Sequence, residues 1–306
     1  MHGVLLLDKP LGWSSNDALQ KVKWLLRAQK AGHTGTLDPL ATGVLPLCFG
    51  AATKFSQLQL DANKEYEAQA LLGTTTSTAD AEGEVLAVRS VQVSEQDLAR
   101  VLPQFLGSIR QTPPMHSALK KDGKPLYEYA RAGIAVERSA REVTIYKLNM
   151  ALGHVGKAGK AIDMVVSCSK GTYIRTLAEV LGQALGCGAH LSALRRTGSG
   201  QLELDVAITL EDLQALSEAE RDARLLPPDV LVAAWPAVDL QDDEAGRFLT
   251  GLRRRVAMAD APAVRVYRRP PEPPDAPRAF LGTAHITAGE LIADRLLSPI
   301  EVQDAK

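Results

Sequence analysis

The stretch Lys30–Pro46 reads KAGHTGTLDPLATGVLP, and the interpretation of the whole chain depends on it. Gly32, Gly35 and Gly43 punctuate it. Glycine permits backbone angles that other residues avoid, so we predict a shaped loop here and neither a helix nor a strand. Asp38 precedes a proline, and a residue in that position is pushed toward extended geometry. We therefore expect a stiff, non-helical turn that presents the Asp38 carboxylate.

The residues alone leave two interpretations of Asp38 open. In the ordinary one, the carboxylate bonds to its own backbone in an Asx turn and is structural. In the other it is a functional group, with His33 nearby. The stretch resembles the GHTGxLDPxATGxLP signature of the TruB-type tRNA pseudouridine synthases over about seventeen residues. The resemblance implies that Asp38 is the catalytic aspartate and that His33 occupies space near the target base.

Length and composition indicate a globular protein with one large and one small domain. The chain has 306 residues, of which 45% are hydrophobic and 23% charged. No apolar run reaches the roughly 18 residues that span a membrane, and Asp8 interrupts the short apolar run at the N-terminus, so we expect neither a membrane segment nor a signal peptide. Cys48, Cys168 and Cys187 form no CxxC pair, which argues against a disulfide framework or a zinc site. A reducing cytoplasm fits.

The net charge of −1 hides an uneven distribution along the chain. Residues 1–200 carry a net charge of +6, residues 201–247 a net charge of −9, and residues 248–306 a net charge of +2. Binding of a polyanion depends on a local basic surface and not on the global sum. The pattern is compatible with RNA binding, although ordinary surface variation would also produce it.

The N-terminal segment predicts a strand followed by a helix. Val4–Leu7 is a short apolar run typical of a buried strand, and Ser14 with Asp17 predicts a capping box that opens a helix. Further along the chain, Ser94 with Asp97 predicts another. The intervening DKPLGWSS run resembles the opening of the same family. That resemblance implies that Lys9 lies near the site and binds substrate.

Lys64–Leu72 alternates apolar and polar side chains, which predicts a strand with Tyr66 on its apolar face. Such a tyrosine is usually part of a core. The KxYxA pattern resembles the family strand whose tyrosine stacks on the target base, which implies that Tyr66 has this role. Gly73–Gly83 is expected to be a polar turn, and Val85–Val88 a further strand that completes a hairpin.

Residues 114–141 are polar and basic around a short helical pattern. Basic residues interleaved with aromatics suit a surface that follows an RNA backbone, and a solvated insertion packed by its aromatics is an equally good interpretation. The run PPMHSALKKDGKPLYEYAR resembles the mobile insertion with which the family clamps the RNA arm.

Residues 161–168 predict a strand, and a helix is expected to start at Thr172 or Tyr173. Arg175 then lies in the first helical turn, where a cation opposes the helix dipole unless an anion faces it. An outward surface arginine is the alternative. The KGTYIRTL run resembles the family motif whose arginine pairs with the catalytic aspartate. The resemblance implies an Asp38–Arg175 pair and a place for Tyr173 in the substrate site. The run LSALRRT at residues 191–197 resembles a second family stretch, which implies that Leu194 lines the pocket.

The fold class that the resemblance implies is α+β, with a mixed, mainly antiparallel sheet in a pseudouridine synthase catalytic domain that carries an RNA-clamping insertion. We expect this domain at residues 1–234, with the insertion at about 114–141. Short strand patterns at 264–267, 280–286 and 290–293 predict a small β-rich domain at residues 235–306, which resembles a PUA-like RNA-binding domain. The five prolines within residues 268–277 exclude regular structure there and predict a surface loop.

The resemblance implies a stand-alone tRNA pseudouridine-55 synthase that flips and isomerises a uridine in the TΨC loop. Asp38, Tyr66 and Arg175 would be catalytic. We expect the T arm of tRNA as partner, a monomer, no guide RNA, and neither cofactor nor metal, because the reaction adds and removes no group. Asp38 would attack C1′, attack C6 or remove a sugar proton, and Tyr66 is a candidate base for the C5 proton. The alternatives are a tRNA-folding chaperone without catalysis and a uridine methyltransferase. The missing Gly-rich cofactor loop counts against the methyltransferase.

Overall fold

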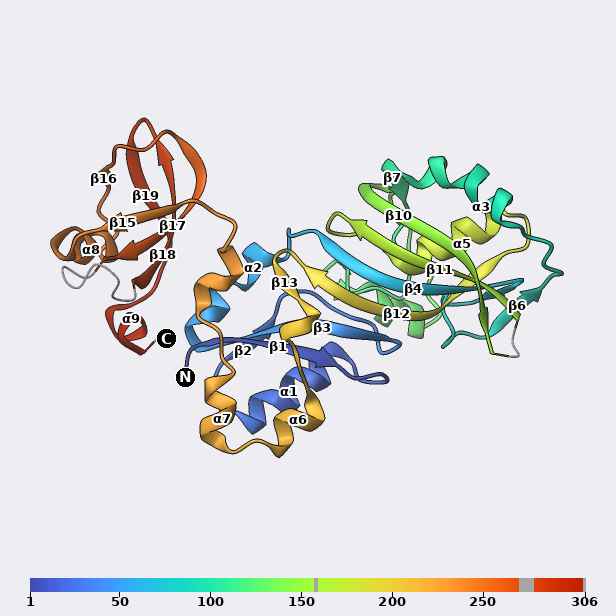
Figure 1. The fold of residues 1–306 in the computed structure, drawn as a ribbon, viewed down its shortest axis with the longest axis horizontal. Coiled ribbons are helices and arrows are strands. Elements are labelled where there is room, and N and C mark those ends of the chain that lie inside the picture. Colours follow the sequence, from blue (N-terminus) through green and yellow to red (C-terminus); the bar gives the residue numbers. More distant parts are fainter. Residues whose placement is uncertain (157–158, 270–277, 305–306) are drawn as a thin grey trace.

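A computed structural model of the protein describes residues 1–156, 159–269 and 278–304. A ten-stranded sheet runs through most of the molecule, and a five-stranded sheet lies at one end of it (Figure 1). Within the described ranges, no helix is long and apolar enough to cross a membrane.

The large sheet is mixed and mainly antiparallel, as predicted. Its strand order is β14 (Ile208–Thr209), β1 (Gly3–Lys9), β3 (Ala41–Phe49), β12 (Ala189–Ser199), β4 (Lys64–Leu72), β11 (Gly159–Cys168), β10 (Arg141–Val155) and β7 (Gly107–Gln111). Two short strands, β2 (Ala31–His33) and β13 (Leu202–Glu203), pair with β3 and β12. The β1–β14 and β3–β12 pairs are parallel, and the other pairs of this sheet are antiparallel.

The helices before the C-terminal sheet are short. The α-helices are α1 (Ser15–Leu25), α2 (Ser56–Gln59), α3 (Glu95–Val101), α4 (Leu126–Arg131), α5 (Ile174–Ala184), α6 (Leu210–Ala215) and α7 (Glu218–Ala223). The 3-10 turns are η1 (Gly50–Lys54), η2 (Leu102–Phe105), η3 (Leu204–Val206) and η4 (Pro228–Val232). Apolar side chains of α1, α3, α5 and α6 share one core with the large sheet.

The burial pattern of two strands explains their sequences. Along β4, the side chains of Lys64, Tyr66, Ala68, Ala70 and Leu72 are buried and those of the intervening residues are more exposed, so the predicted alternation is confirmed. Strand β1 has no alternation because both its faces are covered. One face joins the main core, and the other joins a second core shared with the C-terminal sheet.

Two sequence-based expectations were wrong in part. Residues 30–46 are not all loop, because β2 and most of β3 lie within them and residues 34–40 connect the two strands. The loop prediction relied on the glycines of this stretch. Gly43, however, lies inside β3, where a Cβ would collide with the Arg196 backbone of β12. The predicted hairpin also has a different partner strand. Strand β6 (Val85–Val88) pairs with β5 (Thr74–Thr76), which lies in the segment expected to be a turn.

The predicted helix starts are found. The Ser14 hydroxyl accepts a bond from the Asp17 amide at the start of α1, without the reciprocal bond of a full capping box. Ser94 and Asp97 form a full capping box at α3. Helix α5 begins after Tyr173, so Arg175 lies in its first turn as expected. In the predicted insertion, α4 follows a hairpin of β8 (Lys120–Lys121) and β9 (Lys124–Pro125).

The C-terminal part is β-rich, as predicted. Its sheet has the order β15 (Ala237–Leu240), β17 (Ala261–Arg268), β18 (Ala279–Thr287), β19 (Glu290–Leu296) and β16 (Arg254–Arg255), with helices α8 (Asp242–Leu249) and α9 (Pro299–Asp304). Residues 270–277, which hold the five prolines of the predicted loop, lie outside the described residues.

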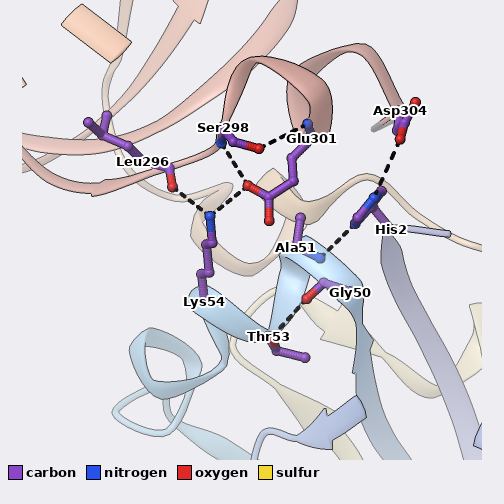
Figure 2. A network of polar contacts seen from close by, with 9 residues as sticks. All are labelled: His2, Gly50, Ala51, Thr53, Lys54, Leu296, Ser298, Glu301 and Asp304. Atoms are coloured by element: carbon purple, nitrogen blue, oxygen red, sulfur yellow. Dashed lines mark hydrogen bonds and ion pairs between the residues drawn. The ribbon is translucent and has the colours of Figure 1, made fainter. Parts of the chain in front are cut away.

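The second core joins the two sheets. The rings of Phe55 and Phe280 lie 5.2 Å apart within it. A polar network also links the two parts, in which Lys54 pairs with Glu301 at 2.6 Å and donates to the Leu296 carbonyl (Figure 2). The two ends of the chain therefore meet, with His2 3.8 Å from Asp304. The domain boundary between residues 234 and 235 stays a prediction.

Candidate active site

The loop that carries Asp38 is held in place by the start of helix α1. The Ser15 hydroxyl accepts a hydrogen bond from the Leu37 amide at 2.7 Å and donates to the Leu37 carbonyl at 2.9 Å. The amide of Gly12 donates to the Pro39 carbonyl on the other side of Asp38. The DKPLGWSS run therefore braces the loop through Ser15.

We expect Ser15→Ala to lower the free energy of unfolding by about 2 kcal/mol, because two buried backbone groups of Leu37 lose their partner. Urea unfolding followed by circular dichroism measures this value. Ser56→Ala is the control, since that hydroxyl makes one half-buried bond to the Thr53 carbonyl. Equal losses in the two variants would contradict a bracing role for Ser15.

Asp38 faces a buried arginine. Arg175 Nε lies 3.0 Å from a carboxylate oxygen of Asp38, and Arg175 Nη1 lies 3.4 Å from one of Asp80. The guanidinium also donates to the carbonyls of Thr78 and His116. The Arg175 side chain is only 5% exposed, so the alternative of an outward surface arginine is wrong. Its position in the first helical turn is stabilised by two carboxylates.

The environment of Asp38 raises its pKa above the ordinary value. Desolvation by the surrounding protein is the largest cause, and the nearby Asp80 carboxylate adds to it. The guanidinium of Arg175 acts in the opposite direction, as we predicted for this residue, but it does not outweigh desolvation. The Asp38 side chain remains 37% exposed, so its carboxylate is open to a ligand.

Lys9 is a second cation near Asp38. Its side chain is buried, and Nζ donates to the carbonyls of Pro10 and Trp13 at 2.9 and 2.6 Å. Desolvation lowers the pKa of Lys9 to about 8, while the charges of Asp38 and Glu82 oppose this shift. The predicted proximity of Lys9 to the site is thus found.

Tyr66 projects from β4 beside Arg196 of β12. The two residues are register partners on neighbouring strands. Burial raises the pKa of the Tyr66 hydroxyl, while Arg196 acts to lower it. The charge of Asp38 also acts on this hydroxyl, so the tyrosine and the aspartate belong to one electrostatic environment.

The other predicted residues lie around this centre. Tyr173 caps α5, and the charges of both Asp38 and Arg175 act on its hydroxyl, whose pKa burial raises. His33 is in β2, where burial and the charge of Arg196 lower its pKa, which favours the neutral ring. Neither residue has a direct bond to Asp38 in the described part of the chain.

Leu194 lines a cavity of about 780 Å³ on the large sheet. Leu40, two residues after Asp38, lines the same cavity from the loop side, and Ala68 and Met164 contribute from β4 and β11. The lining is mainly apolar with a few polar groups, which is typical of a ligand site. Asp38, Tyr66 and Arg175 are not among the residues that line this cavity, so it meets the Asp38 loop only at Leu40.

Comparison with known proteins accounts for this arrangement. A family model described as "TruB family pseudouridylate synthase (N terminal domain)" matches residues 23–174, and one described as "tRNA pseudouridylate synthase B C-terminal domain" matches residues 175–233. A relative from Verminephrobacter eiseniae named "tRNA pseudouridine synthase B" is 63% identical over 305 residues, which cover 99% of this chain and 90% of the relative. The chain belongs to the TruB family. A Ralstonia pickettii relative of the same name is 58% identical over 97% of this chain and 94% of its own.

Solved structures show the same fold over nearly the whole chain. The protein in the "Cbf5-Nop10-Gar1 Complex" has a TM-score of 0.72 and 26% identity, with coverage of 98% of this chain and 86% of that one. A chain in an "H/ACA RNP bound to a substrate RNA containing 2'-deoxyuridine" has a TM-score of 0.71 and 25% identity over the same shares. The TruB resemblance drawn from the motifs is thus confirmed, as is the pseudouridine synthase fold.

Sequence reasoning missed three residues of this TruB site. Asp80 lay in a segment interpreted only as a turn, although Asp80-Ala-Glu-Gly is a turn signal that also delivers a carboxylate. Arg196 lay next to the predicted Leu194, and no local signal distinguished it from Arg195. Ser15 was noted only as part of a turn.

Proposed function

We propose that this chain is a tRNA pseudouridine synthase that isomerises the uridine at position 55 in the TΨC loop. The observation that carries the proposal is the 3.0 Å pair of Asp38 with the buried Arg175, within a chain that matches the TruB family models. Isomerisation breaks the N1–C1′ bond, turns the base and joins C5 to C1′. A partly exposed carboxylate that is paired with a buried guanidinium suits this chemistry.

The proposed roles follow from position. Asp38 acts on the nucleotide by attack at C1′, attack at C6 or removal of a sugar proton. Arg175 favours the ionised carboxylate. Tyr66 stacks on the uracil and is the candidate acceptor of the C5 proton, while Leu194 lines the pocket. Flipping the uridine out of its stack costs a few kcal/mol, which these contacts must offset.

His33, Tyr173 and Lys9 complete the proposed substrate site. The neutral ring of His33 would fill the space that the flipped base vacates. Tyr173 would lie beside the nucleotide, since the charges of Asp38 and Arg175 act on its hydroxyl. Lys9 supplies a cation close to Asp38.

The T arm is the proposed binding partner, without a guide RNA and with a monomeric enzyme. The insertion supports this choice, because Lys120 and Lys121 are exposed in its hairpin and Arg131 lies over the Tyr127 ring at 5.3 Å. Its base reaches the site, where the His116 carbonyl accepts a bond from Arg175 at 2.6 Å. Docking of RNA on the insertion would therefore be transmitted to Arg175 through the His116 carbonyl. A tRNA substrate is consistent with the cytoplasm as the working compartment.

Tritium release tests the function. The enzyme is mixed with tRNA that carries [5-³H]uridine, with no cofactor added, and released tritium is compared with pseudouridine at position 55. We expect the two to be equal and both to vanish with a transcript that has cytidine at position 55. Release without pseudouridine would indicate another reaction at C5, and no release would refute the proposal.

The pH profile of turnover should have an acid and an alkaline limb, in each of which the rate falls. On the acid side, the rate should fall as pH drops through the Asp38 pKa, which lies above its ordinary value of 3.8 because burial disfavours the charge. On the alkaline side, it should fall above a pH of about 8, where Lys9 loses its proton and its support of the Asp38 carboxylate. Single-turnover rates measure both limbs.

Lys9→Met is the control for the alkaline limb of that profile. This variant should turn over more slowly at every pH, and the fall above a pH of about 8 should be missing. An unchanged alkaline limb would show that another group titrates there.

A further inference from the structure

Arg196 is a buried guanidinium that pairs with no carboxylate of the described residues. Its side chain is 1% exposed, and Nε donates to the Val44 carbonyl at 2.8 Å. Nη2 has no hydrogen-bond partner among the described residues, and Tyr66 is the register partner of Arg196 on the neighbouring strand. No acidic side chain in those ranges is among the groups that act on the Arg196 charge.

This arrangement is costly to the fold. Desolvation of a guanidinium without a counterion costs several kcal/mol, and an apolar side chain of similar volume would fill the same space without that cost. The neighbouring Arg195 shows the ordinary solution, because it pairs with Asp8 at 2.7 Å. Stability therefore does not explain why a charged side chain is buried at position 196.

Lys64 provides an internal comparison. It is also a buried cation, on the same face of β4 as Tyr66. Its Nζ donates to the carbonyls of Gln59, Leu60 and Ala62, so all three of its protons are used within the fold. The fold thus accounts for all three protons of Lys64, whereas Nη2 of Arg196 has no acceptor among the described residues and the register partner of Arg196 is Tyr66.

We propose that Arg196 is a positioning residue that acts through its register partner Tyr66, by holding the phenol in one orientation and polarising its hydroxyl. A phenol oxygen that accepts a bond from a guanidinium becomes a stronger donor through its own O–H. The cation also favours negative charge on that oxygen, which opposes the effect of burial. The proposal rests on the proposed isomerase function and adds to it the residue that sets the state of Tyr66.

A double-mutant cycle tests this role. Arg196→Met should lower kcat by about 10²-fold when Tyr66 is present and by less than about 3-fold in a Tyr66→Phe background, because the hydroxyl through which Arg196 acts is then missing. KM for tRNA should change less than about 2-fold in either background. Arg196→Lys should recover part of kcat, since it restores a donor and a charge. Single-turnover assays with excess enzyme make the slow variants measurable.

Stability is separated from function by a matched control. Lys64→Met removes the other buried cation of this region and should lower the melting temperature while leaving kcat unchanged. Each rate is corrected for the folded fraction by circular dichroism. If Arg196→Met does not fold, Arg196→Gln carries the same cycle, because its amide keeps a donor without the charge.

The outcomes distinguish this inference from the proposed function. Equal losses of kcat with and without the Tyr66 hydroxyl, or a loss expressed mainly in KM, would overturn the positioning role. Full kcat in Arg196→Met would do the same, with the isomerase function intact. Absence of pseudouridine with the unmodified enzyme would instead refute the function itself.

Discussion

Replacement of Asp38 by asparagine should lower pseudouridine formation by about 10⁴-fold or more, with tRNA binding largely retained. The amide matches the carboxylate in shape but cannot act as a nucleophile or a base toward the ribose or the uracil. The Asp38 side chain is partly exposed and pairs with Arg175, so the change removes a charge without opening a cavity. Single-turnover tritium release measures the rate, and filter binding measures tRNA affinity.

Asp61→Asn is the control for this prediction. Asp61 is an exposed carboxylate that pairs with Lys170 on the surface, and its loss should leave the rate unchanged. Pseudouridine formation by Asp38→Asn at more than a tenth of the normal rate would remove Asp38 from its role. Refolding of denatured tRNA, scored on native gels in the same samples, separates an enzyme from a folding chaperone. A chaperone would keep its effect in the Asp38→Asn variant.

Replacement of Arg175 by methionine is expected to have the second largest effect, with a loss of about 10³-fold in kcat and of about 3 kcal/mol in the free energy of unfolding. The variant leaves the carboxylates of Asp38 and Asp80 close together without a cation between them. The pKa of Asp38 should then rise further, because the cation that opposes the effect of burial is gone. Urea unfolding and the pH dependence of turnover measure the two effects.

Two companion variants separate charge from geometry. Arg175→Lys keeps the charge, but a single ammonium cannot reach both carboxylates and the carbonyls of Thr78 and His116, so most activity should still be lost. Arg175→Met combined with Asp80→Asn should recover stability but not turnover, because the like-charge repulsion is removed and Asp38 still lacks its partner. Recovery of turnover in this double variant would show that Asp80, and not Arg175, controls Asp38.

Local sequence patterns predicted much of the secondary structure because they report burial. The alternation along residues 64–72 and the capping signals at Ser14 and Ser94 match the structure. Glycine patterns were less reliable. In the stretch 30–46, Gly43 is required by a close strand approach within a sheet, and a single sequence cannot distinguish this from a loop.

The candidate site was partly readable for a similar reason. Asp38 was marked by its loop and Arg175 by its unusual place in a helical turn, and the family motifs paired them before any distance was known. No local sequence feature singled out Asp80 or Arg196 in this way. Each matters through a partner far away in the chain, Arg175 for one and Tyr66 for the other.

The sequence by itself therefore determined the fold class, the family and the pair at the centre of the site. These depend on local spacing and on motifs that stay intact within short stretches. Only the tertiary structure decided how the charges are balanced, with two carboxylates on Arg175 and, within the part of the chain that the structure describes, none on Arg196. It also decided that the C-terminal sheet shares a core with β1 and β3. Desolvation and ion pairing depend on what the folded chain places within a few ångströms, and spacing along the chain does not contain that information.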